Sequence, residues 1–243
     1  MRIALLSDVH GNLPAFQAVL ADVDAQAPDE VWCLGDLVGY GAQPDGCVEL
    51  ARDRCDLSLA GNHDLVVTGE IPITEFSSSA AAAARWTQET IGEEALAYLK
   101  GLAPADPDRE PALYHASPRD PVWEYVLSTW QADECIDLME ARVGAVGHSH
   151  VALWFRRDDS GKMSGATADA GLEHDLSAGR WLVNPGGVGQ PRDGDPRAAW
   201  LLLDTGEWTA TWRRVEYPIE EAARAIEEAG LPRVLAERLF SGQ

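Results

Sequence analysis

Residues 2–12 read RIALLSDVHGN, an apolar run followed, after one serine, by an aspartate and a histidine. The run at 3–7 predicts a buried strand. The residues after it predict a helix from about Leu13, because Asn12 suits the N-cap position and Pro14 the first turn. Ligand sites of open α/β sheets lie where strands end. We therefore expect the polar groups at this junction to belong to a site.

The rest of the chain predicts further strands and helices in two patterns. In the first half strands and helices alternate, which is typical of α/β proteins, and in the second half strands dominate. The expected strands are 3–7, 30–34, 56–60, 112–116, 143–147, 151–157, 180–183, 198–204 and 208–215, and the expected helices begin near 13 and 44 and cover 80–91, 93–102, 132–141, 218–229 and 231–240. We interpret residues 1–243 as one α/β domain. Its polar, Gly- and Ala-rich segment 158–179 is interpreted as a surface insertion that opens with a hairpin turn.

Five of the six histidines lie in short polar motifs, each at the end of an expected strand. The motifs are Asp8-Val9-His10, Gly35-Asp36, Gly61-Asn62-His63-Asp64, His115-Ala116-Ser117 and Gly147-His148-Ser149-His150. Taken alone, Asp8 would be explained as a turn or capping carboxylate, and His115 as a core histidine. Together, carboxylate, imidazole and amide groups without thiolates favour a site for Mn, Fe(II), Co, Ni or Zn. His174 stands outside the motifs and is expected at the surface.

The amino-acid composition limits the binding partners and the cellular compartment that we expect for this chain. With 40 acidic against 19 basic residues the formal charge is −21, which disfavours binding to long nucleic acids and to anionic membrane surfaces. No stretch is apolar enough for a membrane span and the first residues lack the features of a signal peptide, so the expected location is the cytoplasm. The four cysteines show no CxxC spacing and are expected to be free thiols. The oligomeric state stays open.

The motifs DxH, GD, GNHD, HxS and GHSH, in this order, resemble those of the calcineurin-like metallophosphoesterase superfamily, and they span Asp8 to His150. The segments SDVHGN, GDLVGYG and NPGGVGQPRDGDPRA are most similar to its small bacterial phosphodiesterase-like branch. The resemblance implies a two-sheet β-sandwich flanked by helices, with four layers in the order αββα.

The resemblance also implies a set of metal ligands for two divalent ions. One ion would be bound by Asp8, His10 and His150, the other by Asn62, His115 and His148, and the Asp36 carboxylate would bridge them. Manganese is the first choice, with Fe, Ni, Co, Zn or Mg as alternatives. Two such ions lower the pKa of a shared water to about neutral and hold the oxygens of an in-line displacement at phosphorus. The nucleophile would be the bridging hydroxide rather than a side chain.

His63 would remain without a metal in this assignment and is the candidate general acid, because an imidazole can protonate a departing alkoxide near neutral pH. Asp64 would either orient that ring or hydrogen-bond the surrounding loop. Arg119, Arg192 and Asn12 are candidate substrate-binding residues. Surface ion pairs are the alternative for the two arginines, and a helix cap is the alternative for the asparagine.

These residues predict a metal-dependent phosphoesterase that hydrolyses a small phosphodiester. Phosphomonoester hydrolysis and nucleotide pyrophosphate cleavage are alternative reactions, and a noncatalytic metal-binding interaction scaffold is the alternative of another class. Protein phosphatase activity is disfavoured, because Gly39 and Tyr40 stand where the GDxVDRG motif of protein phosphatases and related dinucleotide hydrolases carries Asp and Arg. Most of the nine tryptophans are expected in the core, and nucleotide stacking by Trp123 or Trp130 is an alternative.

Overall fold

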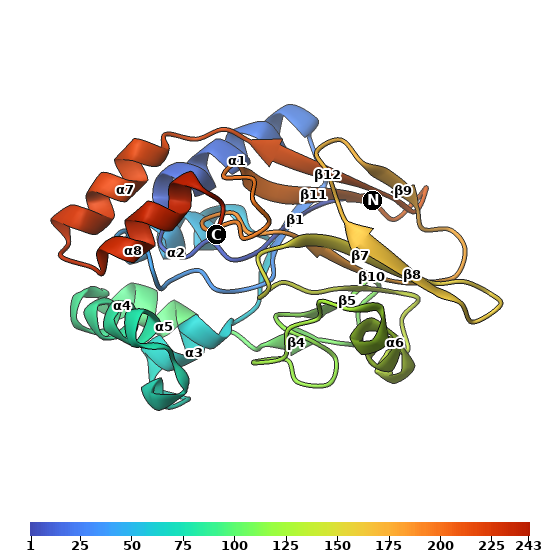
Figure 1. Ribbon diagram of the computed structural model, residues 1–243, viewed down its shortest axis with the longest axis horizontal. Helices are drawn as coiled ribbons and strands as arrows, with labels where there is room; N and C mark the ends of the chain where they lie inside the picture. The colour runs from blue at the N-terminus through green and yellow to red at the C-terminus, as the bar shows by residue number, and fades with distance from the viewer.

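The computed structural model describes residues 1–243 as two six-stranded sheets packed face to face, with helices on the outer faces (Figure 1). This arrangement confirms the two-sheet sandwich that the resemblance implies.

The first sheet has the strand order β3-β2-β1-β11-β12-β9. Its strands are β1 (Arg2–Leu6), β2 (Glu30–Cys33), β3 (Leu57–Ser58), β9 (Glu173–Asp175), β11 (Ala198–Asp204) and β12 (Thr209–Val215). The strands β1, β2 and β3 are parallel, whereas β11, β12 and β9 are added antiparallel. The carboxyl ends of β1, β2 and β3 therefore meet at one edge, and the first three motifs follow them there.

The second sheet has the strand order β4-β5-β6-β10-β7-β8. Its strands are β4 (Ala105–Asp106), β5 (Ala112–Tyr114), β6 (Val143–Ala145), β7 (Ala152–Arg157), β8 (Met163–Thr167) and β10 (Arg180–Pro185). The neighbours β5, β6 and β10 are parallel. The last two motifs, at His115 and His148, follow β5 and β6, so both sheets deliver polar residues from the ends of their parallel strands.

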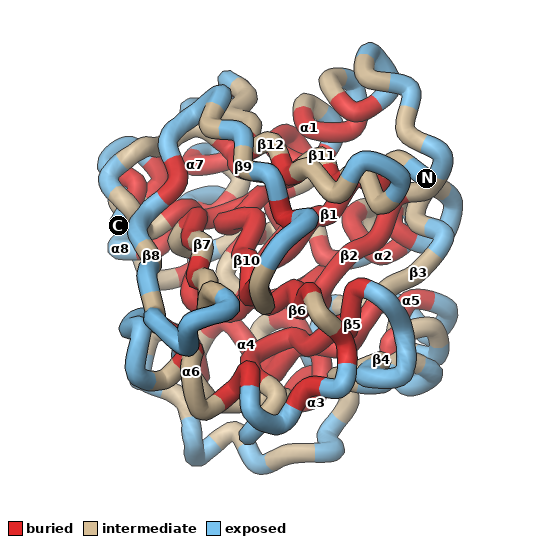
Figure 2. Tube along the Cα trace, turned by 90° about the vertical axis from the view of Figure 1, so that its right-hand side faces the viewer, coloured by how far each residue is buried: buried red, intermediate tan, exposed pale blue.

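The strand β1 shows how the layers form. Ile3 and Leu5 pack between the sheets in one cluster with Trp181 of β10. Ala4 and Leu6 point to the other face and pack against helices. Because successive side chains alternate between faces, a strand that is apolar throughout is buried on both sides. Burial of a side chain as large as leucine contributes about 1.5–3 kcal/mol. Figure 2 shows that the central strands are buried, whereas exposed residues lie in the outer helices, in loops and on the edge strands β8 and β9.

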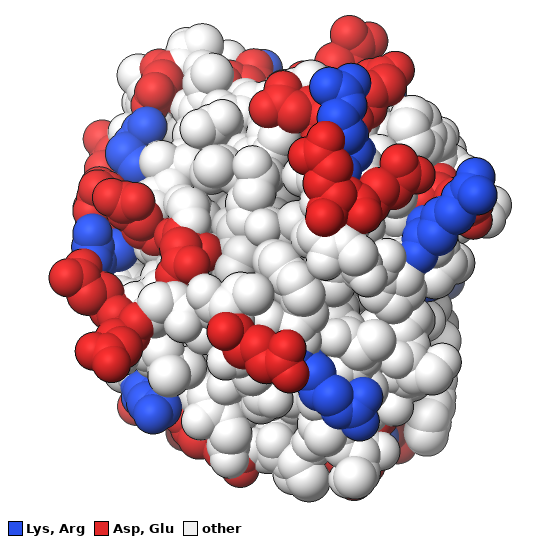
Figure 3. Space-filling view, turned by 90° about the vertical axis from the view of Figure 1, so that its left-hand side faces the viewer, with Lys and Arg blue, Asp and Glu red and all other residues white.

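Helices cover the outer faces of both sheets (Figure 1). Those that pack in one core cluster with the first sheet are α1 (Leu13–Gln26), α2 (Pro44–Arg54), α3 (Asn62–Thr68), α4 (Ser78–Thr90), α5 (Glu93–Leu99), α7 (Ile219–Glu228) and α8 (Arg233–Glu237), with the short helices η1 (Ile73–Glu75) and η2 (Arg238–Phe240) nearby. The helix α6 (Thr129–Leu138) packs on the second sheet. Figure 3 shows acidic side chains in several groups on the side of the molecule that carries α4 and α7, in line with the charge of −21.

The segment 158–179, expected as a surface insertion, supplies one edge strand to each sheet. The expected hairpin turn is confirmed, since β7 and β8 pair antiparallel around it, while β9 pairs with β12 in the other sheet. His174 of β9 is half-buried, and its ring centroid lies 4.4 Å from that of Trp154. Edge strands need few apolar side chains, which explains their polar composition.

Two other expectations concern thiols and membranes. All four cysteines are free, and Cys33, Cys47 and Cys135 are buried, as expected. None of the helices is both long enough and apolar enough to cross a membrane.

Candidate metal centre

Several polar residues that follow strands have a left-handed backbone. Asp8, Asp36 and His148, which follow β1, β2 and β6, have φ angles of 57°, 55° and 61°. His10 and His150 share this conformation, with φ angles of 51° and 57°. Residues other than glycine seldom adopt it, and it costs roughly 1–3 kcal/mol at each position. Strain of this kind persists only where the surrounding fold imposes it, and it is typical of functional sites.

One group of buried side chains brings Asp8, His10, Asp36 and His150 together, with ligand atoms within 4.8 Å of one another. His10 Nε2 lies 3.4 Å from Asp36 Oδ2, and His150 Nε2 lies 3.4 Å from Asp8 Oδ1. The two imidazole Nε2 atoms are 3.0 Å apart. The residues come from both sheets, because His150 follows β6 whereas the other three follow β1 and β2.

A second group joins Asp36 to His115 and His148, again with ligand atoms within 4.8 Å of one another. His115 Nε2 lies 3.6 Å from Asp36 Oδ2 and 3.3 Å from Asn62 Oδ1. The Asn62 amide, at the start of α3, therefore lies beside this group. Asp36 belongs to both groups and has the position of a shared ligand.

Each of the four histidines in these groups has its other ring nitrogen beside a backbone carbonyl oxygen. These pairs are His10 Nδ1 with Val38 at 3.1 Å, His115 Nδ1 with Leu34 at 2.8 Å, His148 Nε2 with Trp123 at 3.2 Å and His150 Nδ1 with Gln190 at 2.6 Å. A carbonyl oxygen only accepts hydrogen bonds, so each of these ring nitrogens carries the proton and donates it. The remaining nitrogen of each neutral ring then has a free lone pair, which is the arrangement that orients a metal-binding histidine.

The carboxylates of Asp8 and Asp36 each accept a hydrogen bond on one oxygen only. Asp8 Oδ2 accepts a hydrogen bond from the His148 backbone N–H at 3.1 Å, and Asp36 Oδ1 accepts one from the His63 backbone N–H at 2.9 Å. The other oxygens, Asp8 Oδ1 and Asp36 Oδ2, are buried without any hydrogen-bond donor. Burial raises the pKa of Asp8 to about 7 and raises the pKa of Asp36 well above its ordinary value.

Buried acceptors without donors are unfavourable, and lone pairs of His10 and His150 that face each other add repulsion. A cation removes both problems, because it attracts carboxylate oxygens and imidazole lone pairs together. The donor set of carboxylate, imidazole and amide therefore fits divalent metal ions.

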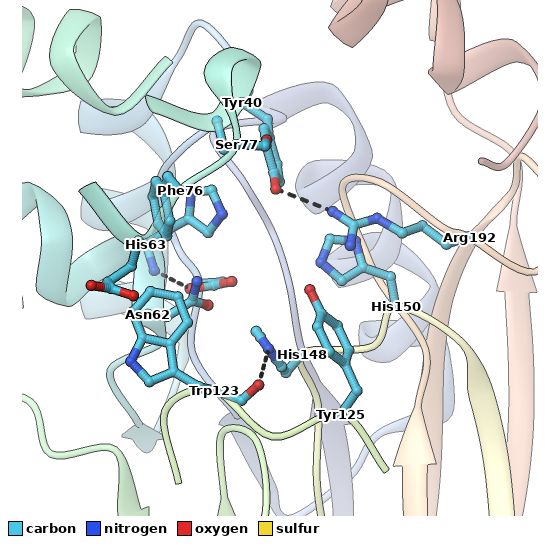
Figure 4. Close-up of a pocket in the computed structure, with 13 residues that line it drawn as sticks. Tyr40, Asn62, His63, Phe76, Ser77, Trp123, Tyr125, His148, His150 and Arg192 are labelled. Carbon is cyan, nitrogen blue, oxygen red and sulfur yellow. Dashed lines mark hydrogen bonds between the residues drawn. The ribbon is translucent and has the colours of Figure 1, made fainter. Parts of the chain in front are cut away.

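The two groups open into a cavity of about 230 Å³. Asp36, Asn62, His148 and His150 line its floor. In Figure 4, Arg192 lies on the same side as His150, whereas His63, Phe76 and Trp123 lie on the opposite side.

Comparison with known proteins identifies the family of this chain. The model of the calcineurin-like phosphoesterase superfamily domain matches residues 1–207. The chain belongs to the calcineurin-like phosphoesterase superfamily. Uncharacterized protein MJ0912 of Methanocaldococcus jannaschii is 37% identical over 246 residues, which cover 99% of this chain and 98% of that protein. A solved metallophosphoesterase from Sphaerobacter thermophilus is 40% identical, and the match covers 100% of this chain and 99% of the other with a TM-score of 0.90.

A further, shorter similarity concerns a tetraphosphatase. Symmetrical bis(5'-nucleosyl)-tetraphosphatase of Actinobacillus pleuropneumoniae is 35% identical over 68 residues, which cover 27% of this chain and 25% of that protein. This match is too short to describe the whole chain.

In this calcineurin-like chain, His63 lies outside both donor groups. It is buried at the start of α3, with its ring centroid 4.4 Å from the centroids of Tyr40 and Phe76. Its Nδ1 has no hydrogen-bond partner and packs against Gly39, where an added β-carbon would lie 2.3 Å away. Asp64 does not orient this ring. Its carboxylate accepts hydrogen bonds from the backbone N–H groups of residues 37, 38 and 61. Asp64 therefore hydrogen-bonds the surrounding loop, which was the alternative to orienting the ring.

Of the three candidate substrate-binding residues, the structure brings only Arg192 to the cavity. Its guanidinium donates to the Tyr40 hydroxyl at 3.3 Å and to Gln190 Oε1 at 3.1 Å. Arg119 instead forms ion pairs with two glutamates outside the cavity. Asn12 caps α1 by accepting from Ala15 N at 3.1 Å and also donates to the Gly189 carbonyl at 2.8 Å. Arg119 therefore forms the ion pairs, and Asn12 the helix cap, that the sequence offered as alternatives to substrate binding.

Several residues around the cavity belong to none of the sequence motifs. Phe76 and Tyr125 line it without belonging to any motif, and Trp123 was considered only as one alternative. Trp130 does not line the cavity and is 64% exposed on α6. A cluster of aromatic residues in polar loops was the only available signal, and it does not tell which rings face the site.

Proposed function

We propose that the chain is a two-metal phosphoesterase that hydrolyses small phosphodiesters, with His63 as the general acid. One observation carries this proposal. Two groups of metal-ligand side chains share Asp36 and open into a cavity that also holds an unligated imidazole and a guanidinium.

The side chains that would hold the ions follow from the two groups. Asp8, His10 and His150 would hold one ion, Asn62, His115 and His148 the other, and Asp36 both. When bound, such ions activate water and neutralise charge on the phosphate group. Manganese is our first choice, because the mixture of oxygen and nitrogen donors suits moderately hard ions.

His63 would transfer a proton to the departing alkoxide. Because Nδ1 is packed against Gly39, Nε2 is the ring atom that can reach a group in the cavity. Burial, and then the positive charge of Arg192, lower the pKa of His63 well below its ordinary value of 6.5. A phosphate anion in the cavity acts in the opposite direction and favours the protonated ring.

Arg192 would bind the phosphate oxygens. Tyr40 stands where related motifs carry an arginine, and here its hydroxyl accepts a hydrogen bond from the Arg192 guanidinium. Arg192 forms no ion pair with a carboxylate and is the only lysine or arginine that lines the cavity. A guanidinium without a carboxylate partner is available to donate hydrogen bonds to phosphate oxygens.

Nucleotide pyrophosphate cleavage is the second candidate, supported by the short similarity to a bis(5'-nucleosyl)-tetraphosphatase. Gly39 and Tyr40 argue against it, because they replace the Asp and Arg of the GDxVDRG motif. A comparison of kcat/KM for bis-p-nitrophenyl phosphate, p-nitrophenyl phosphate and diadenosine tetraphosphate decides among diester, monoester and pyrophosphate hydrolysis.

The test of the proposed function combines metal analysis with turnover. We expect purified protein supplied with Mn, Ni, Co, Mg or Zn to bind about two ions per chain and to hydrolyse bis-p-nitrophenyl phosphate. Asp36→Asn should lose both properties, whereas the control Asp159→Asn, at an exposed turn, should keep them. Protein without bound ions would refute the proposal. Bound ions without turnover of any of the three substrates would favour an interaction scaffold instead.

We also propose a cytoplasmic location and small rather than polymeric substrates. Four free thiols suit a reducing compartment, and the charge of −21 repels long polyanions. Cell fractionation and a binding assay with duplex DNA and RNA at low salt test the two statements, and a membrane-bound or nucleic-acid-bound protein would contradict them.

A further inference from the structure

One wall of the cavity is aromatic. Phe76 follows η1, and Trp123 and Tyr125 belong to the loop between β5 and α6, so segments far apart in the sequence meet here. In Figure 4, Phe76 and Trp123 lie on the side of His63, away from Arg192. The guanidinium side also carries the Tyr40 ring, whose centroid lies 5.6 Å from the central carbon of the Arg192 guanidinium, whereas Phe76 and Trp123 stand on the side of His63.

Phe76 and Trp123 form a corner rather than a closed stack. Their ring centroids are 5.8 Å apart with planes at 84°, so the edge of one ring faces the other. Phe76 also packs on His63, with centroids 4.4 Å apart and planes at 36°. Both side chains are only partly buried. A flat group in the cavity would contact the face of one ring and the edge of the other, which are the contacts that aromatic pairs prefer.

Tyr125 is a further aromatic residue that lines the cavity, beside His148. One face of its ring stacks on His148, with centroids 4.2 Å apart and planes at 22°. The side chain is nevertheless 44% exposed, although it lines the cavity. Aromatic surface left open beside a polar centre indicates a binding surface.

The position of His63 assigns the two sides to different parts of a substrate. Its Nε2 serves the departing oxygen, so the leaving group must lie on the side of the cavity where His63 packs against Phe76. Arg192, on the opposite side, is free for the phosphate oxygens (Figure 4). The leaving group therefore has an aromatic corner as its nearest neighbour.

We propose that Phe76 and Trp123 bind a flat ring on the leaving group of the substrate, which makes this group a nucleoside or an aryl alcohol. This inference rests on the proposed function, because His63 defines the leaving-group side. Stacking of a base on an aromatic side chain strengthens binding by about tenfold.

The test measures binding and turnover separately. Titration calorimetry of the Mn-loaded protein compares adenosine 5'-monophosphate, phenyl phosphate and ribose 5-phosphate, which share a phosphate monoester and differ in the ring. Chromatography of the ligand after each titration checks for hydrolysis. The variants are Phe76→Ala, Phe76→Leu and Trp123→Ala. The control is Trp130→Ala, which removes an exposed indole outside the cavity.

We expect at least one of the two ring-bearing ligands to bind wild-type protein about tenfold more tightly than ribose 5-phosphate. This advantage should fall about tenfold in Phe76→Ala and Trp123→Ala, fall in part in Phe76→Leu and persist in Trp130→Ala. A larger advantage for adenosine 5'-monophosphate than for phenyl phosphate would identify a nucleoside, and the reverse would identify an aryl group.

Equal affinity for all three ligands, or an advantage that survives in both alanine variants, would overturn the aromatic subsite. Hydrolysis of bis-p-nitrophenyl phosphate by the same preparation separates the two proposals. Turnover with equal affinities refutes only the subsite, whereas a ring-dependent affinity without turnover refutes the proposed reaction and leaves a ring-binding site without a leaving-group role.

Discussion

At Gly61, an added β-carbon would lie 1.9 Å from Asp36 Oδ1. The backbone of Gly61 is extended, so an alanine meets no φ strain there, but its β-carbon would clash with the shared carboxylate and would lie 2.5 Å from the Asp36 backbone nitrogen. We predict that Gly61→Ala displaces Asp36 and lowers the metal content below one ion per chain, as measured by elemental analysis. Gly101→Ala is the control, because its nearest neighbour, the Tyr98 carbonyl oxygen, lies 3.3 Å from the added carbon. Equal metal content in the two variants would contradict the prediction.

His63 provides a prediction about turnover alone. His63→Asn removes the proposed acid but no proposed ligand, so the ions should stay and kcat should fall by about 10² or more. Metal analysis and steady-state kinetics on one preparation check both statements. The loss should be smaller on a substrate with a p-nitrophenyl leaving group, because that group needs little protonation. An unchanged kcat on alkyl esters would eliminate the role of His63.

Single residues show what the sequence can and cannot predict about the site. The donors that gather around Asp36 were predicted, because their motifs have a fixed order along the chain. The carbonyl oxygens of Leu34 and Val38 that orient the histidines were not predictable, since every residue has such an oxygen. The ion pairs of Arg119 were not predictable, because its glutamate partners are brought to it by the fold.

At the scale of elements, α1 depends on Asn12 for two contacts. Its side chain caps the helix and also ties the helix start to the Gly189 carbonyl, which lies in a buried loop. We predict that Asn12→Ala lowers the free energy of unfolding by about 1 kcal/mol for the cap and by a further 1–3 kcal/mol for the unpaired carbonyl. Urea denaturation of metal-free protein measures the loss.

The cap of α6 serves as the control for this prediction. Ser128 accepts a hydrogen bond from Gln131 N at 3.2 Å, but it is exposed. Ser128→Ala should therefore lose only the cap contribution of about 1 kcal/mol. Equal losses in Asn12→Ala and Ser128→Ala would show that the contact with Gly189 adds no stability.

Elements with a strong apolar pattern were predicted well, and edge elements were not. The strand β1 is apolar on both faces because sheet and helices cover it, so its pattern was visible in the sequence. The edge strands β8 and β9 are exposed along much of their length and left no such pattern. The strand β3 spans only Leu57–Ser58, shorter than expected, because the chain leaves the sheet early to reach Gly61.

At the scale of the whole molecule, the metal centre should influence stability. Buried oxygens of Asp8 and Asp36 without donors cost roughly 1–3 kcal/mol each in the metal-free fold. We predict that EDTA lowers the melting temperature of the wild-type protein. Free metal at 1,000 times its Kd would add about 4 kcal/mol to the free energy of unfolding. Differential scanning calorimetry measures the shift, and a shift of equal size in Asp36→Asn would show that the ions act elsewhere.

The reactivity of the four cysteine thiols is a second measure of whether the whole chain is folded. Burial raises the pKa of all four cysteines, that of Cys135 to about 11 and that of Cys55 to about 12. Thiolate is the reactive form, and unfolding returns the thiols to a pKa of about 8.5. We predict that Ellman's reagent at pH 8 modifies the folded protein slowly and modifies all four thiols promptly in denaturant. Prompt modification of folded protein would contradict this account.

Both donor groups draw on both sheets, since Asp8 and Asp36 follow strands of one sheet while His115, His148 and His150 follow strands of the other. No contiguous peptide, and no single layer, contains the complete coordination set. A protein engineer who wishes to transplant this chemistry into another scaffold must reproduce the spacing between two layers as well as the loops. The smallest portable unit is therefore the sandwich itself.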